Sequence, residues 1–200
     1  MAEIVLITKE QQQTSTWTGG TTTQISIYPP KSNFLDRDFM WRLSTAYVEV
    51  EESNFTKLAG FDRHLMVLEG RLELVHKGQH SVVLQQYEQD SFKGGWETVS
   101  FGMARDFNLM LKEGIKGKLE HYKAASGVQF KVELQADGQR DSFFACYCHR
   151  GQICLYANNQ NVTVGEGDLL LINYNDYLTI TLENKYIEEC NLIAVFIEIY

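Results

Sequence analysis

The chain has 200 residues, 26 of them acidic and 18 basic, and its net charge is −8. This acidity argues against a nucleic-acid-binding protein, which needs basic side chains to neutralise phosphates, and against electrostatic adhesion to an anionic membrane. Apolar residues make up 44% of the chain, so we expect a folded protein with a buried core. The first residues lack the apolar core of a signal peptide and no apolar run approaches ~18 residues, so we expect a cytoplasmic location.

Short segments of alternating polar and apolar residues predict an all-β fold along the whole chain. Segment 40–50 is the longest, rich in aromatic and β-branched residues and free of Gly and Pro. Helices are expected to be few and short, with 54–58 as an example. Many short strands separated by Gly, Asn and Asp turns are typical of barrels and sandwiches. The other expected strands are 24–28, 64–68, 72–76, 81–84, 98–101, 107–111, 117–122, 129–134, 143–148, 153–156, 162–164, 169–172, 178–182 and 192–199.

Two hairpins of the same layout indicate an internal repeat. Segments 67–74 (VLEGRLEL) and 148–155 (CHRGQICL) each read as strand, tight turn and strand. Gly70 and Gly151 supply the positive φ that such turns require.

An acidic turn follows each hairpin, and the second one, in the segment 165–170 (GEGDLL), resembles the G-D turn of cupin barrels. The repeat therefore predicts two cupin-like β-barrels, a bicupin. We expect the first barrel in residues 1–120 and the second in 121–200, packed together, and an exchange of strands between them stays open.

The sequence contains no recognisable metal or catalytic motif. No two of its five histidines stand two residues apart, and His76 and His80 flank an expected hairpin tip, where both should be solvated. Cys146 and Cys148 share a strand face and Cys154 faces the other way, which disfavours a metal site. Because no secretory signal is evident, Cys146, Cys148, Cys154 and Cys190 are expected to be reduced thiols. There is no nucleophile elbow and no phosphate loop. We therefore expect no metal, no cofactor and no assigned catalytic residue.

Polar side chains interrupt several apolar strands at positions that share a face. Arg42 and Ser44 stand two residues apart, as do Asp106 and Asn108, and Arg63 precedes a strongly apolar strand. Taken together, they predict a ligand pocket inside the first barrel. The alternative is a set of structural buried ion pairs, Arg42 with Asp106 or Arg63 with its neighbour in sequence.

Residues near the start of the first barrel are expected to close this pocket. Trp17 and the Gly19-Gly20 loop are placed over its opening, and Trp17 and Gly20 are included among the ligand-binding residues. Trp41 alternates to the face opposite Arg42 and is assigned to packing.

Five blocks, in order along the first barrel, carry a resemblance to the HutD/Ves family of bicupin proteins. They are WTGGTTTQISIYP (17–29), MWRLSTAYV (40–48), FTKLAGFDRHLMVLEG (55–70), FKGGW (92–96) and GMARDFNLM (102–110). The chain departs from the family pattern at Gly95, where an acid is usual, and at Glu113, in the place of a basic residue. The resemblance implies a bacterial, cytosolic, metal-free bicupin associated with histidine utilisation or stress response.

Three functions remain open on the sequence. The first is binding of a small anionic metabolite, as a sensor or regulator, by a monomer or homodimer. The second is a metal-independent isomerase or hydrolase acting on a small carboxylate, with Asp106 as base and Arg42 or Arg63 stabilising an anion. A cation beside Asp106 is expected to lower its pKa, which disfavours that role. The third is a protein-interaction module.

Overall fold

The computed structural model describes residues 2–136, 141–157 and 160–199, and it is almost entirely β-structure, as predicted. The helical content of these residues is one short 3-10 turn, η1 (Lys9–Gln11). The segment 54–58 is not helical: after β5 (Glu52–Asn54) the chain runs irregularly. The amides of Phe55 and Leu58 donate to carbonyls far along the chain, at Thr98 and Gly94, rather than to a preceding helical turn.

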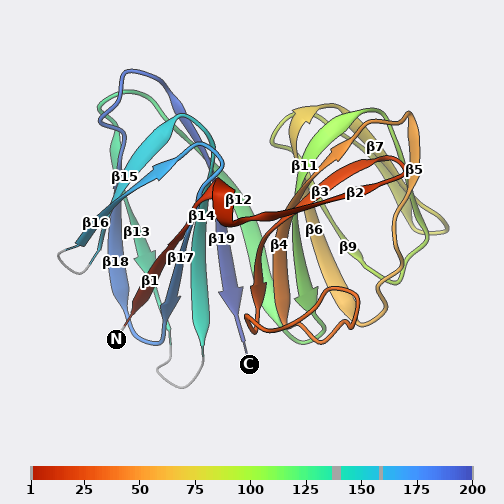
Figure 1. Cartoon of the computed structure of the whole chain (residues 1–200), viewed down its shortest axis with the longest axis horizontal. Coiled ribbons are helices and arrows are strands. Elements are labelled where there is room, and N and C mark those ends of the chain that lie inside the picture. Colours follow the sequence, from red (N-terminus) through yellow and green to blue (C-terminus); the bar gives the residue numbers. More distant parts are fainter. Residues whose placement is uncertain (1, 137–140, 158–159, 200) are drawn as a thin grey trace. The chain divides into compact units, whose positions relative to one another are not determined.

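The chain forms two compact units, Gln12–Glu113 and a second that joins Met1–Gln11 to Gly114–Tyr200. We call them the N-terminal and C-terminal barrels. This division differs from the expected boundary between residues 120 and 121. The reason is that strands at both ends of the expected first segment, residues 1–120, pair with strands of the second unit. β1 (Glu3–Ile7) pairs with β17 (Leu169–Tyr174), beside which it lies in Figure 1. β12 (Lys116–Ala124) pairs with β19 (Cys190–Glu198).

The N-terminal barrel consists of two antiparallel sheets. The larger has the strand order β2-β3-β4-β11-β6-β9, and the smaller has the order β5-β10-β7-β8. The strands not yet defined are β2 (Gln13–Trp17), β3 (Gly20–Tyr28), β4 (Trp41–Val48), β6 (Phe61–Gly70), β7 (Leu72–His76), β8 (His80–Leu84), β9 (Gln89–Lys93), β10 (Thr98–Phe101) and β11 (Ala104–Lys112).

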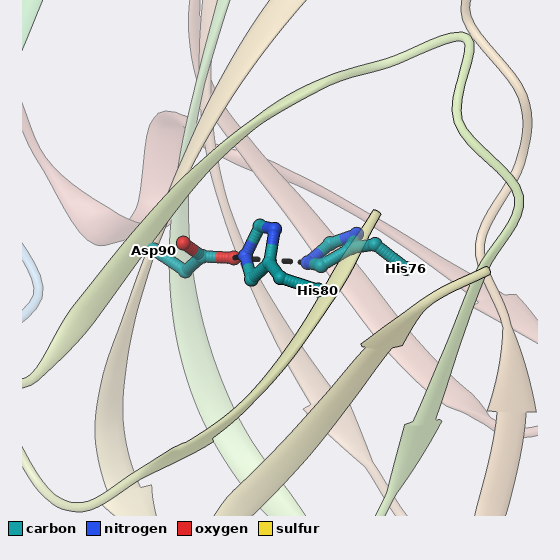
Figure 2. A group of neighbouring side chains, drawn as sticks. All are labelled: His76, His80 and Asp90. Carbon is teal, nitrogen blue, oxygen red and sulfur yellow. Dashed lines mark hydrogen bonds and ion pairs between the residues drawn. The ribbon is translucent and has the colours of Figure 1, made fainter. Parts of the chain in front are cut away.

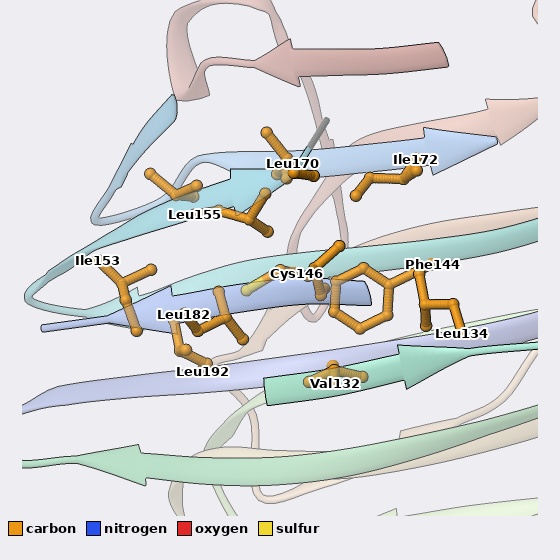
Figure 3. Packing of buried hydrophobic residues seen from close by; sticks show 14 of the residues in the cluster. Val132, Leu134, Phe144, Cys146, Ile153, Leu155, Leu170, Ile172, Leu182 and Leu192 are labelled. Atoms are coloured by element: carbon orange, nitrogen blue, oxygen red, sulfur yellow. The ribbon is translucent and has the colours of Figure 1, made fainter. Parts of the chain in front are cut away.

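The C-terminal barrel is also built from two antiparallel sheets, ordered β1-β17-β14-β19-β12 and β13-β18-β15-β16. Its core is a continuous apolar cluster to which Phe144, Ile153 and Leu170 contribute from different strands, as Figure 3 shows. None of the helices in the described part of the chain is long and apolar enough to cross a bilayer. The remaining strands are β13 (Gln129–Leu134), β14 (Ser142–Arg150), β15 (Gln152–Ala157), β16 (Gln160–Gly165) and β18 (Leu178–Glu183).

The pairing of β4, β11 and β6 determines which side chains face the interior of the N-terminal barrel. Ser44 of β4 pairs with Asn108 of β11, which also pairs with Leu65 of β6. Residues in register on neighbouring strands share a face, and so do residues two apart on one strand. Arg42 and Arg63, each two residues from one of these positions, therefore face the same interior.

Candidate functional site

The N-terminal barrel encloses a cavity of about 330 Å³, near the lower end of the range of small-molecule sites. The predicted residues Arg42, Ser44, Arg63, Asp106 and Asn108 all line it. The full lining consists of Ser15, Trp17, Thr22, Phe34, Leu35, Arg42, Ser44, Ala46, Val48, Ser53, Asn54, Phe55, Thr56, Leu58, Arg63, Asp106, Asn108 and Met110.

Arg42 is held in place by neighbours on two strands and by an aromatic ring. Its Nε donates to Oε1 of Gln24 on β3 over 2.8 Å, and Nη1 donates to Oγ of Ser44 over 3.1 Å. The guanidinium carbon lies 4.5 Å from the centre of the Phe34 ring. Arg42 is 6% exposed and is therefore a buried cation in the cavity wall. The side chains that accept its hydrogen bonds, Gln24 and Ser44, are neutral.

Arg63, Asn108 and Asp106 form a chain of hydrogen bonds across β6 and β11. Nη2 of Arg63 donates to Oδ1 of Asn108 over 2.8 Å, and Nδ2 of Asn108 donates to Oδ1 of Asp106. The Arg63 guanidinium carbon lies 4.7 Å from the centre of the Phe55 ring and 5.2 Å from that of Phe92. Its Nε is buried and has no hydrogen-bond partner among the described residues. Arg63 thus has a buried donor without a partner in the wall of a cavity that is open to solvent near Trp17 and Leu35.

The direct ion pairs of the alternative, Arg42 with Asp106 and Arg63 with Asp62, are not formed among the described residues, although the charge of Asp106 acts on Arg63. Among the described residues, no ion pair connects Arg42 or Arg63 to a carboxylate. Asp62 points to the opposite face of β6 from Arg63, and its Oδ1 lies 2.6 Å from Nζ of Lys93. The cavity therefore holds two cations and the single carboxyl group of Asp106.

Burial is the largest influence on the pKa of Arg42, of Arg63 and of Asp106. It lowers the pKa of Arg42 and of Arg63 from 12.5 to about 10, so both remain cations at neutral pH. Burial also raises the pKa of Asp106 from 3.8 to about 7, against the opposing effects of Arg63 and of the hydrogen bond from Asn108. Arg63 does act to lower the pKa of Asp106, as expected, but the expected net decrease is wrong because desolvation exceeds the attraction.

The two residues expected over the opening have different places. Trp17 lines the cavity, is 37% exposed, and donates from Nε1 to Oγ1 of Thr22 over 3.2 Å. Gly20 does not line it. A Cβ at Gly20, where φ is +147°, would stand 1.9 Å from the carbonyl oxygen of Tyr47, so glycine is required by the close approach of β3 to β4.

Comparison with protein families identifies the chain. The family model described as HutD matches residues 9–188. The chain belongs to the HutD family. None of the curated proteins compared with it matches.

Solved structures similar to this HutD-family chain share its fold. A conserved protein of unknown function, PA5104 from Pseudomonas aeruginosa PAO1, is 22% identical with a TM-score of 0.85, covering 98% of this chain and 100% of its own. HutD from Pseudomonas fluorescens SBW25 is 20% identical with a TM-score of 0.71, covering 96% and 98%. A cupin 2 conserved barrel domain protein from Leptotrichia buccalis is 12% identical with a TM-score of 0.55, covering 96% and 95%. The fold of this HutD-family chain is therefore cupin-like.

Three residues that contact the arginines of this cavity were not found from the sequence. Gln24 could have been found from the alternation of β3, which places it on the interior face. Phe34 and Phe55 lie outside regular strands, where no periodicity points to the cavity. Their proximity to the arginines results from tertiary structure alone.

The histidines of the β7–β8 hairpin differ from the expectation that both are solvated. His76 is buried and His80 is exposed, and both rings are turned toward Asp90 (Figure 2). The pairing of His76 with His80 across the hairpin places both on one face of the sheet. The cysteines agree with the prediction: Cys146 and Cys148 are buried, Cys154 faces elsewhere, and these thiols are free.

Proposed function

We propose that the N-terminal barrel binds a small anionic metabolite through a carboxylate. The observation that carries the proposal is the pair of buried guanidiniums, Arg42 and Arg63, which share one cavity without an ion pair to any carboxylate of the described residues. The unpartnered Nε of Arg63 supports it further.

Burying a cation costs several kcal/mol unless opposite charge and hydrogen bonds compensate. Here the compensation from the protein is partial, because Gln24, Ser44 and Asn108 are neutral and the pKa of Asp106 is raised to about 7. A ligand carboxylate would supply the missing charge, and the planar fork of arginine binds it through parallel hydrogen bonds. The whole chain carries a net charge of −8, which repels anions. A local region of positive charge, such as the two arginines provide, is therefore needed to attract an anion.

Each cavity residue has a distinct role in this proposal. Arg42 and Arg63 anchor the carboxylate, and the Ser44 hydroxyl adds a contact beside Arg42. Asn108 and Asp106 hold Arg63 in position and recognise a polar substituent of the ligand. Trp17 lies at the exposed end of the lining.

Membership of the HutD family supports a role for this binding in histidine utilisation, with the protein as a sensor or regulator. The amino acid histidine and other small carboxylic acids are accordingly the first ligands to test.

A second function is favoured by one observation, the pKa of about 7 for Asp106. A carboxyl group that titrates near neutral pH can both accept and donate a proton, as general acid–base catalysis requires. In this alternative the protein is a metal-independent isomerase or hydrolase of a small carboxylate, with Asp106 moving the proton and an arginine stabilising the anion.

A thermal-shift screen against small mono- and dicarboxylates, histidine included, separates the two functions when each mixture is then analysed by NMR. The binding function predicts that a carboxylate raises the melting temperature and is recovered unchanged. Conversion of the stabilising compound favours the enzyme. If no carboxylate stabilises the protein, or if the stabilisation persists in Arg42→Met, the proposal fails.

A further inference from the structure

A second cluster of polar side chains lies in the same barrel, outside the cavity lining. His76, at the end of β7, pairs in register with His80, at the start of β8. Asp90, on β9, belongs to the other sheet of the barrel. The turn between the two histidines brings their rings to one face of the smaller sheet. The carboxylate of Asp90 reaches the same place from the larger sheet.

The three side chains converge on a single point, as Figure 2 shows. Nε2 of His76 lies 2.9 Å from Oδ2 of Asp90, and Nε2 of His80 lies 3.0 Å from the same oxygen. One ligand atom from each residue lies within 4.8 Å of the other two. Their side chains range from full burial at His76 to 40% exposure at His80, so the cluster opens to solvent on one side.

We propose that His76, His80 and Asp90 form a binding site for a divalent transition-metal ion of the zinc type. Two imidazole nitrogens and one carboxylate oxygen are a donor set that suits zinc and its neighbours in the first transition row, whereas Mg²⁺ and Ca²⁺ prefer oxygen ligands. The exposed side at His80 leaves room for a water molecule as a fourth ligand.

The two contacts with Asp90 need little adjustment to accept the ion, and the two histidine nitrogens lie within 4.8 Å of each other. Bonds of about 2.0–2.1 Å at a tetrahedral zinc place neighbouring ligand atoms roughly 3.3 Å apart. The nitrogen–oxygen separations of 2.9 and 3.0 Å therefore have to grow by only a few tenths of an ångström. Rotation of the exposed His80 side chain can supply this movement.

The surroundings of His76 prepare it as a ligand. Its Nδ1 lies 2.7 Å from Oγ1 of Thr98, and a proton on Nδ1 donated to that hydroxyl leaves the lone pair of Nε2 directed at the site. Such an outer partner fixes the tautomer and orientation of metal-binding histidines. The ring is also packed against Phe92 at 4.4 Å and Trp96 at 5.7 Å between ring centres, which limits its rotation.

Charges of both signs face the cluster, and the carboxylate of Asp90 within it offsets the nearby cations. Lys77, which follows His76, is engaged by Glu97. Arg63 and His80 both disfavour positive charge at His76, whereas Asp90 favours it, and the ring of Phe92 contacts both Arg63 and His76. A metal ion would therefore join β7, β8 and β9 next to the cavity wall, where it would stabilise the barrel.

Zinc titration by calorimetry on chelator-treated full-length protein tests the proposal. We expect one Zn²⁺ per chain, a higher melting temperature with zinc, and affinity at least about tenfold lower in His80→Gln and in Asp90→Asn. His64→Gln is the matched control, because His64 is in the same barrel but bonds Ser91 outside the cluster, and it should bind as wild type. Both cluster variants should fold, since His80 is exposed and Asn preserves the shape of Asp90.

Cobalt provides the readout that identifies the ligands. With Co²⁺ we expect visible bands of a low-coordinate ion with nitrogen and oxygen ligands, lost in His80→Gln. The proposal is overturned if zinc shows no saturable binding, or if both cluster variants bind as wild type. Sulfur-to-cobalt charge-transfer bands that persist in His80→Gln would also overturn it, by placing the ion at the cysteines. No carboxylate ligand enters these measurements, so their outcome is independent of the proposed function.

Discussion

Replacing Arg63 by methionine tests whether this buried cation serves a ligand or the fold. Methionine keeps an unbranched apolar side chain beside the rings of Phe55 and Phe92, and it removes the charge and the hydrogen bond to Asn108. The charge of Arg63 also opposes the protonation of Asp106, so its loss leaves that carboxyl group neutral over a wider pH range.

Two opposing effects set the change in stability. Burial lowers the pKa of Arg63 from 12.5 to about 10, so folding disfavours its charged form by about 3 kcal/mol. The hydrogen bond that methionine removes contributes about 1.5–3 kcal/mol, because its donor is charged. These effects nearly cancel, and we expect the free energy of unfolding to change by less than about 2 kcal/mol. Breaking a structural buried ion pair would instead cost about 3–5 kcal/mol.

Urea unfolding and calorimetric titration with the best carboxylate of the screen measure the two consequences. Loss of one charged hydrogen-bonding anchor should weaken carboxylate binding about 10- to 100-fold. Arg105→Met is the control, because Arg105 lies on β11 with its Nη1 3.3 Å from Oε1 of Glu69, outside the cavity lining. A loss of stability above about 3 kcal/mol in Arg63→Met, or unchanged carboxylate binding, would refute the reasoning.

Three further predictions follow from other cavity contacts. Gln24→Ala should weaken carboxylate binding several-fold in the same titration, because the Nε of Arg42 loses the acceptor that orients it; unchanged affinity would remove Gln24 from the site. Asp106 has a folded-state pKa of about 7 against an ordinary 3.8, so the folded protein keeps a proton that the unfolded chain loses, and stability should fall as pH rises from about 4 to 7. In urea unfolding across that range, Asp106→Asn should therefore gain up to about 1.4 kcal/mol per pH unit over wild type, and parallel profiles would contradict this. Gly20→Ala should destabilise the protein by more than about 2 kcal/mol in the same assay, because its Cβ would stand 1.9 Å from the Tyr47 oxygen, and wild-type stability would show that β3 can move aside.

The strand alternation in the sequence is enough to predict the interior face of the larger sheet. Arg42 and Ser44, two residues apart on β4, and Asp106 and Asn108, two apart on β11, do share one cavity. The ion pair of Arg63 with its neighbour Asp62, left open on the sequence, is not formed among the described residues: adjacent residues on β6 face opposite ways, and Asp62 contacts Lys93.

The partners of these residues depend on tertiary structure and could not be predicted in the same way. The rings of Phe34 and Phe55 come from irregular segments, and nothing local in the sequence directs them to the arginines. The raised pKa of Asp106 results from the depth of its burial, which the sequence does not reveal. The pairing of His76 with His80, by contrast, follows from the hairpin once its turn is recognised.

The cavity of the N-terminal barrel is tested most directly by calorimetric titration of the full chain with one small carboxylate and with its neutral amide. The two ligands differ in charge far more than in shape. We predict that the carboxylate binds at one site per chain, that the amide does not bind, and that the double variant Arg42→Met and Arg63→Met binds neither. Equal binding of carboxylate and amide, or wild-type affinity in the double variant, would contradict the assignment of the two arginines as anion anchors.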